Sequence, residues 1–246
     1  MDQTSIEAST VDSVMSRLGF WSAIMTAVIA AVFFLAGILT PPRSGPFAPP
    51  ADTIPYPYTN VAAFIPNDYL WLYPGILLAP IFIVLMACIH AYARNDRKVF
   101  SQIALSFSVI YATIILIDYF IQFTVVIPSI LTGETAGLSL FTQYNPHGIF
   151  IAFEALGYSM MSIAFLFTGA VFAGGKLERA LRWIFIAGFV VAVLFFAALS
   201  VLQYDLVAFE VTILTINWIV LIVSGVLLSV VFRRAARGRS VPARAV

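Results

Sequence analysis

The chain alternates six long apolar stretches with short polar segments. The apolar stretches cover approximately residues 18–40, 69–92, 99–127, 147–173, 181–203 and 209–232. Each is long enough for a helix to cross a hydrocarbon layer about 30 Å thick, which takes about 20 residues. Barrel strands would be about half as long and would alternate polar and apolar positions. The pattern therefore predicts an all-α integral membrane protein, a bundle of six transmembrane helices.

The composition agrees with this interpretation. Hydrophobic residues make up 61% of the 246 residues and charged residues only 10%, with a mean hydropathy of +0.99. Soluble domains are typically about a quarter charged. The single cysteine, Cys88, excludes an intrachain disulfide, and two histidines are too few for a histidine-rich metal site. The sequence therefore indicates no metal and no cofactor.

The basic residues predict the topology. Lys and Arg collect on the cytoplasmic side of short loops. With the N-terminus inside, 12 of the 13 basic residues fall on that side, and only Arg43 lies outside. We therefore expect both termini inside and a location in the cytoplasmic (inner) membrane. The chain divides into a cytoplasmic segment (1–17), the transmembrane domain (18–232) and a basic cytoplasmic tail (233–246), for which anionic lipid is a better partner than nucleic acid.

Two outer connections differ from the short, charged inner loops. Residues 41–68 hold eight of the thirteen prolines, which favours extended backbone. This segment forms either a cap over the outer mouth of the bundle or a linker on the lipid headgroups. The second connection, residues 132–146, ends in Asn145 and Pro146, which are typical of a helix start. We therefore expect the fourth span to begin there.

Polar residues inside the apolar stretches are the candidates for function, because lipid tolerates them poorly. Helical spacing sorts them into one stripe on each of three spans. The candidates are Tyr111, Asp118 and Gln122 on the third span; His147, Glu154 and Tyr158 on the fourth; and Glu210 and Asn217 on the sixth. Three polar faces on apolar helices favour a shared interior.

Depth groups these candidates in the outer half of the membrane. Glu154 lies eight residues past Pro146, or about 12 Å along a helix. Asn217 lies at a similar depth, and Asp118 comes late in a span that rises from the inside. The sequence predicts an outward-opening polar pocket among spans three, four and six, with Glu154 opposite Asp118. Such a pair would carry a proton, bind a cation or amine, or share a purely structural hydrogen bond.

A ladder of small residues follows the first span. Gly19, Ala23, Ala27 and Ala31 recur every four residues, which allows another helix to approach closely. The approaching helix belongs either to the same bundle, the commoner case, or to a partner subunit.

Three functions remain open. The first is binding or transport of a small molecule, cation or proton in the outer pocket. The second is an accessory or assembly subunit whose polar residues only lock helices together. The third is an intramembrane enzyme that acts on a lipid or isoprenoid, with Glu154 or Asp118 as acid or base and His147 assisting. It ranks last because the sequence shows no nucleophile, metal set or phosphate-binding cluster.

Overall fold

Long helices dominate the structure, a computed structural model that describes residues 3–238 and the side chains of residues 14–237. No strand occurs within this described range. The helices are α1 (Gln3–Leu39), α2 (Leu72–Tyr92), α3 (Lys98–Ile121), α4 (Ile127–Thr132), α5 (Ile149–Val171), α6 (Lys176–Phe195) and α7 (Leu206–Gly238). Six helical segments are long and apolar enough to cross a membrane, as predicted.

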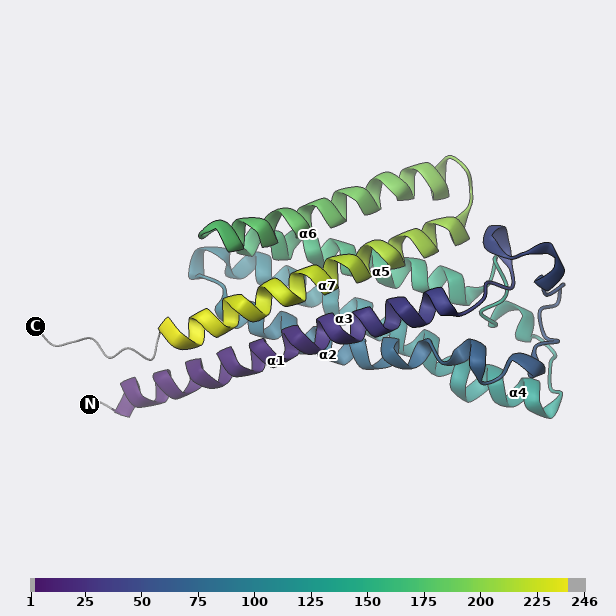
Figure 1. The fold of residues 1–246 in the computed structure, drawn as a ribbon, viewed down its shortest axis with the longest axis horizontal. Helices are drawn as coiled ribbons and strands as arrows, with labels where there is room; N and C mark the ends of the chain where they lie inside the picture. The colour runs from purple at the N-terminus through teal and green to yellow at the C-terminus, as the bar shows by residue number, and fades with distance from the viewer. Residues whose placement is uncertain (1–2, 239–246) are drawn as a thin grey trace, which may run out of the picture.

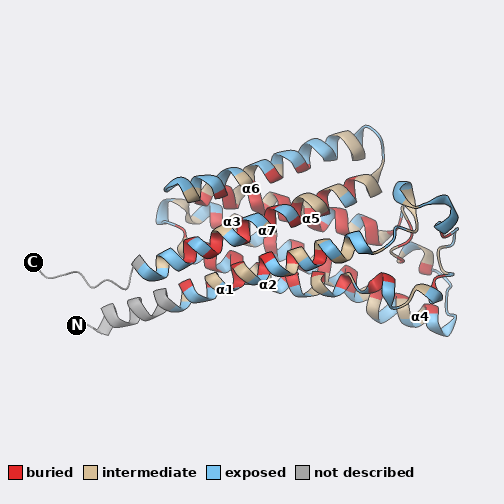
Figure 2. Cartoon of the chain, in the orientation of Figure 1, coloured by how far each residue is buried: buried red, intermediate tan, exposed pale blue. Residues whose placement is uncertain are grey.

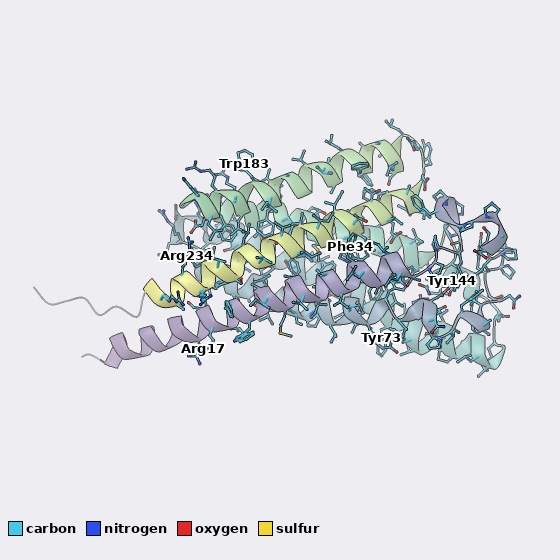
Figure 3. All side chains as sticks on the ribbon, in the orientation of Figure 1. Arg17, Phe34, Tyr73, Tyr144, Trp183 and Arg234 are labelled. Carbon is cyan, nitrogen blue, oxygen red and sulfur yellow. The ribbon has the colours of Figure 1, made fainter. Side chains whose placement is uncertain are left out.

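The six segments run back and forth, so both ends of the described chain lie at the same end of the bundle (Figure 1). We call this the termini end. Residues 40–71 and 133–148 form the opposite, loop end. Arg17 and Arg234 lie at the termini end and Tyr144 at the loop end (Figure 3).

Five of the six membrane-length helices form a ring, and the remaining one, α6, lies outside it. Around the ring, α1 packs against α2, α2 against α3, α3 against α5, α5 against α7, and α7 against α1. Helix α6 packs mainly on α5 and α7, through a narrow stripe that includes Phe185 and Gly188. Its remaining surface is largely exposed (Figure 2). As a result, α5 and α7 are neighbours although α6 lies between them in the chain.

Several helix limits differ from the predicted ones. Helix α1 begins at Gln3 instead of residue 18, and α7 continues to Gly238, so the tail is helical at its start. Residues 239–246 of the predicted tail lie outside the described residues. Helix α5 begins at Ile149 after the N-cap Gly148. Asn145 instead closes a tight turn, its Oδ1 accepting the backbone N–H of His147 at 2.9 Å.

The third span contains an irregular turn. After α3, residues Gln122–Val126 form a π-helical turn that leads into α4. Pro128, the second residue of α4, has no N–H to donate, which removes one regular helical hydrogen bond there. Gly133 ends α4 with a left-handed backbone (φ 81°), a conformation that glycine adopts without steric cost. The span therefore reaches Thr132, five residues further than predicted.

The proline-rich connection lies across the loop end (Figure 1). Four single 3₁₀ turns interrupt its extended backbone: Gly45–Phe47, Pro50–Asp52, Ala62–Phe64 and Asn67–Tyr69. The sequence predicted extended backbone for this connection but did not predict the four turns. Residues Pro41 to Ser44 and Phe47 line a pocket, described next.

Candidate functional site

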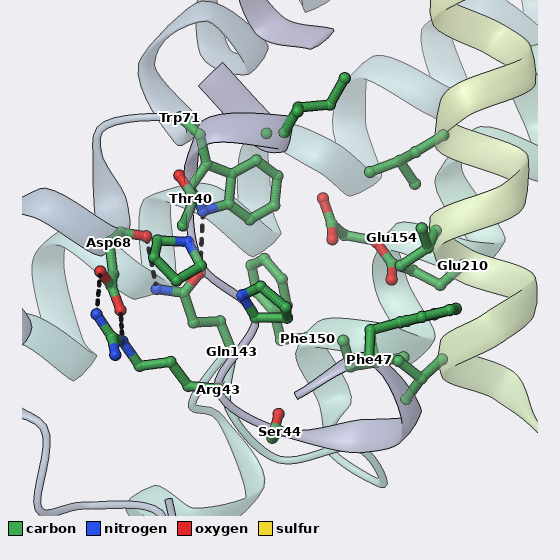
Figure 4. A pocket seen from close by; sticks show the side chains of 18 of the residues that line it. Thr40, Arg43, Ser44, Phe47, Asp68, Trp71, Gln143, Phe150, Glu154 and Glu210 are labelled. Atoms are coloured by element: carbon green, nitrogen blue, oxygen red, sulfur yellow. Dashed lines mark hydrogen bonds and ion pairs between the residues drawn. The ribbon is translucent and has the colours of Figure 1, made fainter. Parts of the chain in front are cut away.

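A pocket of about 360 Å³ opens at the loop end, bounded mainly by α1, α5, α7 and the proline-rich connection. Figure 4 shows it from close by. The third span contributes none of the lining residues. The predicted pocket among spans three, four and six is therefore wrong in one wall, because α1 takes the place of the third span.

Two buried carboxyl groups lie in the pocket. Glu154 comes from α5 and Glu210 from the first turns of α7, and their side chains point toward one another (Figure 4). Glu154 is fully buried and Glu210 is 5% exposed. The Tyr119 hydroxyl, from α3, donates a hydrogen bond to Glu154 Oε1. With both acids ionised, Glu154 Oε2 has no hydrogen-bond partner among the described residues. The Glu154 and Glu210 carboxyl groups lie within hydrogen-bond reach of one another, so a shared proton can join the pair.

Aromatic rings form much of the wall around these carboxyls. Trp71, at the start of α2, packs edge-on to Phe150 with 6.1 Å between ring centroids. Trp218 and Phe34 meet at 5.8 Å on the α1–α7 side. Phe47 of the connection also lines the pocket. Ring faces carry partial negative charge, so they add to the field of the two acids.

An ion pair holds the rim. Arg43 donates from Nε and Nη2 to the Asp68 carboxylate, and the Nη2–Oδ1 distance is 3.2 Å. The bond to Asp68 raises the pKa of Arg43, so the guanidinium stays charged. The Tyr144 hydroxyl donates to Asp68 Oδ2 at 3.2 Å, and burial raises the pKa of that hydroxyl. The Arg43 guanidinium also lies 3.7 Å from the Phe64 ring centroid.

A second set of hydrogen bonds fixes Trp71 to the same rim. Trp71 Nε1 donates to Gln143 Oε1 at 3.2 Å, and Gln143 Nε2 donates to the backbone oxygen of Asp68 at 3.1 Å (Figure 4). Since Asp68 neutralises Arg43, the rim adds little net charge to the pocket. Within the described residues, neither Glu154 nor Glu210 forms an ion pair with a basic side chain.

The structure places Asp118 outside the pocket. Its side chain is buried on α3, and Oδ2 has no hydrogen-bond partner among the described residues. The predicted partner for Glu154 was Asp118; the pocket instead pairs Glu154 with Glu210, because α5 packs on α7. Asp118 nevertheless lies close enough to interact electrostatically with both Glu154 and Glu210.

Other predicted candidates have structural partners. Asn217 donates to the Ile213 backbone oxygen at 2.7 Å and to Ser162 Oγ at 3.1 Å, which ties α7 to α5. Gln122 donates to the Phe141 backbone oxygen at 2.7 Å and so anchors the second connection. His147 is exposed and lines no part of the pocket.

Two predicted tyrosines continue inward from Glu154. Tyr158 lies beside Tyr119, and Tyr111 packs edge-on to Tyr158 with 5.4 Å between centroids. Both are fully buried, and neither hydroxyl has a partner of good hydrogen-bond geometry in the described chain. These residues lie next to the carboxyl site, and none of them lines the pocket.

Sequence reasoning missed several residues of the site. Tyr119 follows Asp118 directly but lies about 100° around the helix, outside the stripe chosen on α3. Trp71 and Trp218 were not among the candidates, because only polar residues inside the apolar stretches were considered. Arg43 carried the one available signal, since it is the single basic residue predicted on the outer side.

The small-residue ladder of α1 packs within the bundle. A side-chain carbon added to Gly19 would lie 2.6 Å from the Phe232 ring on α7. Gly225 of α7 approaches Ala23 and Ala27 equally closely. Ala31, the last ladder position, is partly buried. Three of the four positions are therefore occupied by contacts to α7, the commoner of the two predicted alternatives.

The arrangement suits recognition of a positively charged group, because two acids and several aromatic side chains line one pocket. Among the described residues, no group of three or more His, Cys, Asp or Glu side chains could hold a metal ion. Comparison with protein-family models, with curated proteins and with solved structures gave no match.

Proposed function

We propose that this multi-pass membrane protein binds a small organic cation in the loop-end pocket. The observation that carries the proposal is the buried Glu154–Glu210 pair, which lines the pocket and has no basic partner among the described residues. A cation between the two groups would displace the proton that they can share and would pair with both carboxylates. The aromatic wall favours an amine or quaternary ammonium over a small inorganic ion, since ring faces attract organic cations.

The magnitudes support a cation over a neutral ligand. Two opposite charges about 4 Å apart attract by about 4 kcal/mol at an effective dielectric constant of about 20. A desolvated cation–ring contact adds about 2 kcal/mol. A neutral molecule of the same shape would gain neither contribution.

The apolar packing below the site favours binding over an open path. Phe82 packs edge-on against both Tyr111 and Phe165, at centroid distances of 5.7 and 6.1 Å. All three rings are buried. In this conformation these rings separate the site from the termini end, so a ligand reaches it from the loop-end half of the bundle. Transport would require a second conformation in which the rings move apart.

We also propose that the loop end faces the outside, since the opposite orientation would put 12 of 13 basic residues on the outer side. Single cysteines at exposed positions test this in a Cys88→Ala background. A membrane-impermeant maleimide applied to intact cells should label Leu140→Cys at the loop end and leave Ala236→Cys at the termini end unlabelled. The reverse pattern would refute the orientation.

Binding is tested on the purified protein in lipid nanodiscs with benzyltrimethylammonium, read through tryptophan fluorescence, because Trp71 and Trp218 line the pocket. Its uncharged carbon isostere, neopentylbenzene, is the matched ligand. We expect at least tenfold weaker binding of the cation in Glu154→Gln and in Glu210→Gln. Glu134→Gln is the control, since it neutralises an exposed carboxyl at the loop end that does not line the pocket, and it should change affinity less than threefold.

Two results would contradict the proposal. Equal affinity for the cation and the uncharged isostere would show that charge is not recognised. Unchanged affinity in both glutamate variants, with thermal unfolding like that of the unmodified protein, would show that the pocket is not the binding site.

A further inference from the structure

The pocket reaches the lipid-facing surface of the bundle. Two of its lining residues, Ile38 on α1 and Val211 on α7, are 63% and 42% exposed. Both lie within the membrane-spanning segments Val14–Leu39 and Leu206–Arg237. The pocket therefore has exposed lining residues on both α1 and α7, in segments that are long and apolar enough to cross a membrane.

This opening has a structural cause in the side chains of α1 and α7. Toward the termini end, Gly19 meets Phe232, and Gly225 meets the backbone of Ala23, so the two helices pack closely. Toward the loop end the ladder of small residues stops. Gly37 lies against Trp218, and a side-chain carbon added to Gly37 would lie 3.1 Å from the Trp218 ring. Above that contact the two helices enclose the pocket, and we call the gap that Ile38 and Val211 flank the slot.

The walls of the slot are apolar. Leu214 lies beside Val211 on the α7 side and Phe34 below Ile38 on the α1 side. The one hydroxyl on the α7 wall, that of Thr215, donates to the Val211 backbone oxygen at 2.8 Å and so is satisfied within its own helix. An alkyl chain can occupy such walls without leaving a polar group unpaired.

We propose that the ligand is a single-chain cationic amphiphile that enters from the bilayer. Its ammonium head lies between Glu154 and Glu210, and its chain leaves through the slot into the lipid. This inference rests on the proposed function, because the head must be a cation for the two acids to hold it. The buried acidic pair matches the cationic head of such a ligand, and the apolar slot matches its alkyl chain.

Plugging the slot tests the proposal. The variants Ile38→Trp and Val211→Trp place a large ring at the opening, and Val32→Trp places one on the exposed surface of α1 away from the pocket. Binding is measured in nanodiscs with two cations. For dodecyltrimethylammonium, which partitions into the bilayer, the dissociation constant is expressed as a mole ratio of ligand to lipid. Benzyltrimethylammonium lacks the long chain and serves as the cation without a tail in the slot. Thermal unfolding of each variant is compared with that of the unmodified protein.

We expect the two slot variants to weaken dodecyltrimethylammonium binding at least tenfold more than they weaken benzyltrimethylammonium binding. Val32→Trp should change neither. If both cations bind and the slot variants alter neither affinity, the lateral entry is wrong and the proposed function stands. If neither cation binds the unmodified protein, both are wrong. If dodecanol binds as well as the cationic chain and is equally sensitive to the plugs, the slot admits lipid but the cationic head is refuted.

Discussion

Replacing Asp68 with Asn should destabilise the loop end, because it removes the negative charge that pairs with the Arg43 guanidinium. Arg43 donates two hydrogen bonds to Asp68, and the Asp68 side chain is only 4% exposed. Removing one member of a buried ion pair costs about 3–5 kcal/mol. The Arg43 side chain keeps 15% exposure and its contact with Phe64, which places the expected loss near the lower limit, about 3 kcal/mol.

The loss should appear in thermal unfolding of the purified protein in detergent micelles. For a chain of this size, 1 kcal/mol corresponds to about 2–4 °C in Tm, so we expect a decrease of about 6–12 °C. A double-mutant cycle with Arg43→Gln isolates the pair, and the double variant should be less destabilised than the sum of the single variants by about 2 kcal/mol. Strict additivity, or a single-variant loss below about 0.5 kcal/mol, would refute the role given to this ion pair.

Two further predictions concern packing between helices. Gly225→Ala should destabilise the fold by about 1–3 kcal/mol, because the added carbon would lie 2.8 Å from the Ala27 side chain; Gly175→Ala, with nothing within 4 Å, is the control in the same thermal assay. Equal Tm values for the two variants would contradict the close α1–α7 contact. Asn217→Ala should cost about 1 kcal/mol by removing its bond to Ser162, yet leave benzyltrimethylammonium affinity unchanged. Lost binding in a stable Asn217→Ala protein would instead place Asn217 in the site.

The sequence predicted the spans because crossing a membrane is a local requirement. Each apolar stretch must satisfy its own backbone and match the thickness of the hydrocarbon, whatever its neighbours do. The errors at the ends followed from local chemistry. Asn145 and Pro146 resemble a helix start, yet Asn145 closes a turn and the helix begins at Ile149.

The sequence identified the two acidic residues of the candidate site but did not predict how they are arranged in space. Helical spacing found Glu154 and Glu210, since each lies on the polar stripe of its own helix. It could not say which stripes face each other. Glu154 was expected opposite Asp118, and the pocket pairs it with Glu210.

The sequence alone thus determined the number of spans, their lengths and the polar face of each. Only the tertiary structure decided the neighbours. Helix α6 lies outside the ring, so α5 meets α7 and the two glutamates share one pocket. Small residues bring α1 onto α7 at one end, and Phe34 and Trp218 bound the pocket at the other. The physical reason is that hydrophobicity acts on each segment separately, whereas the order of helices depends on side-chain shapes across contacts distant in sequence.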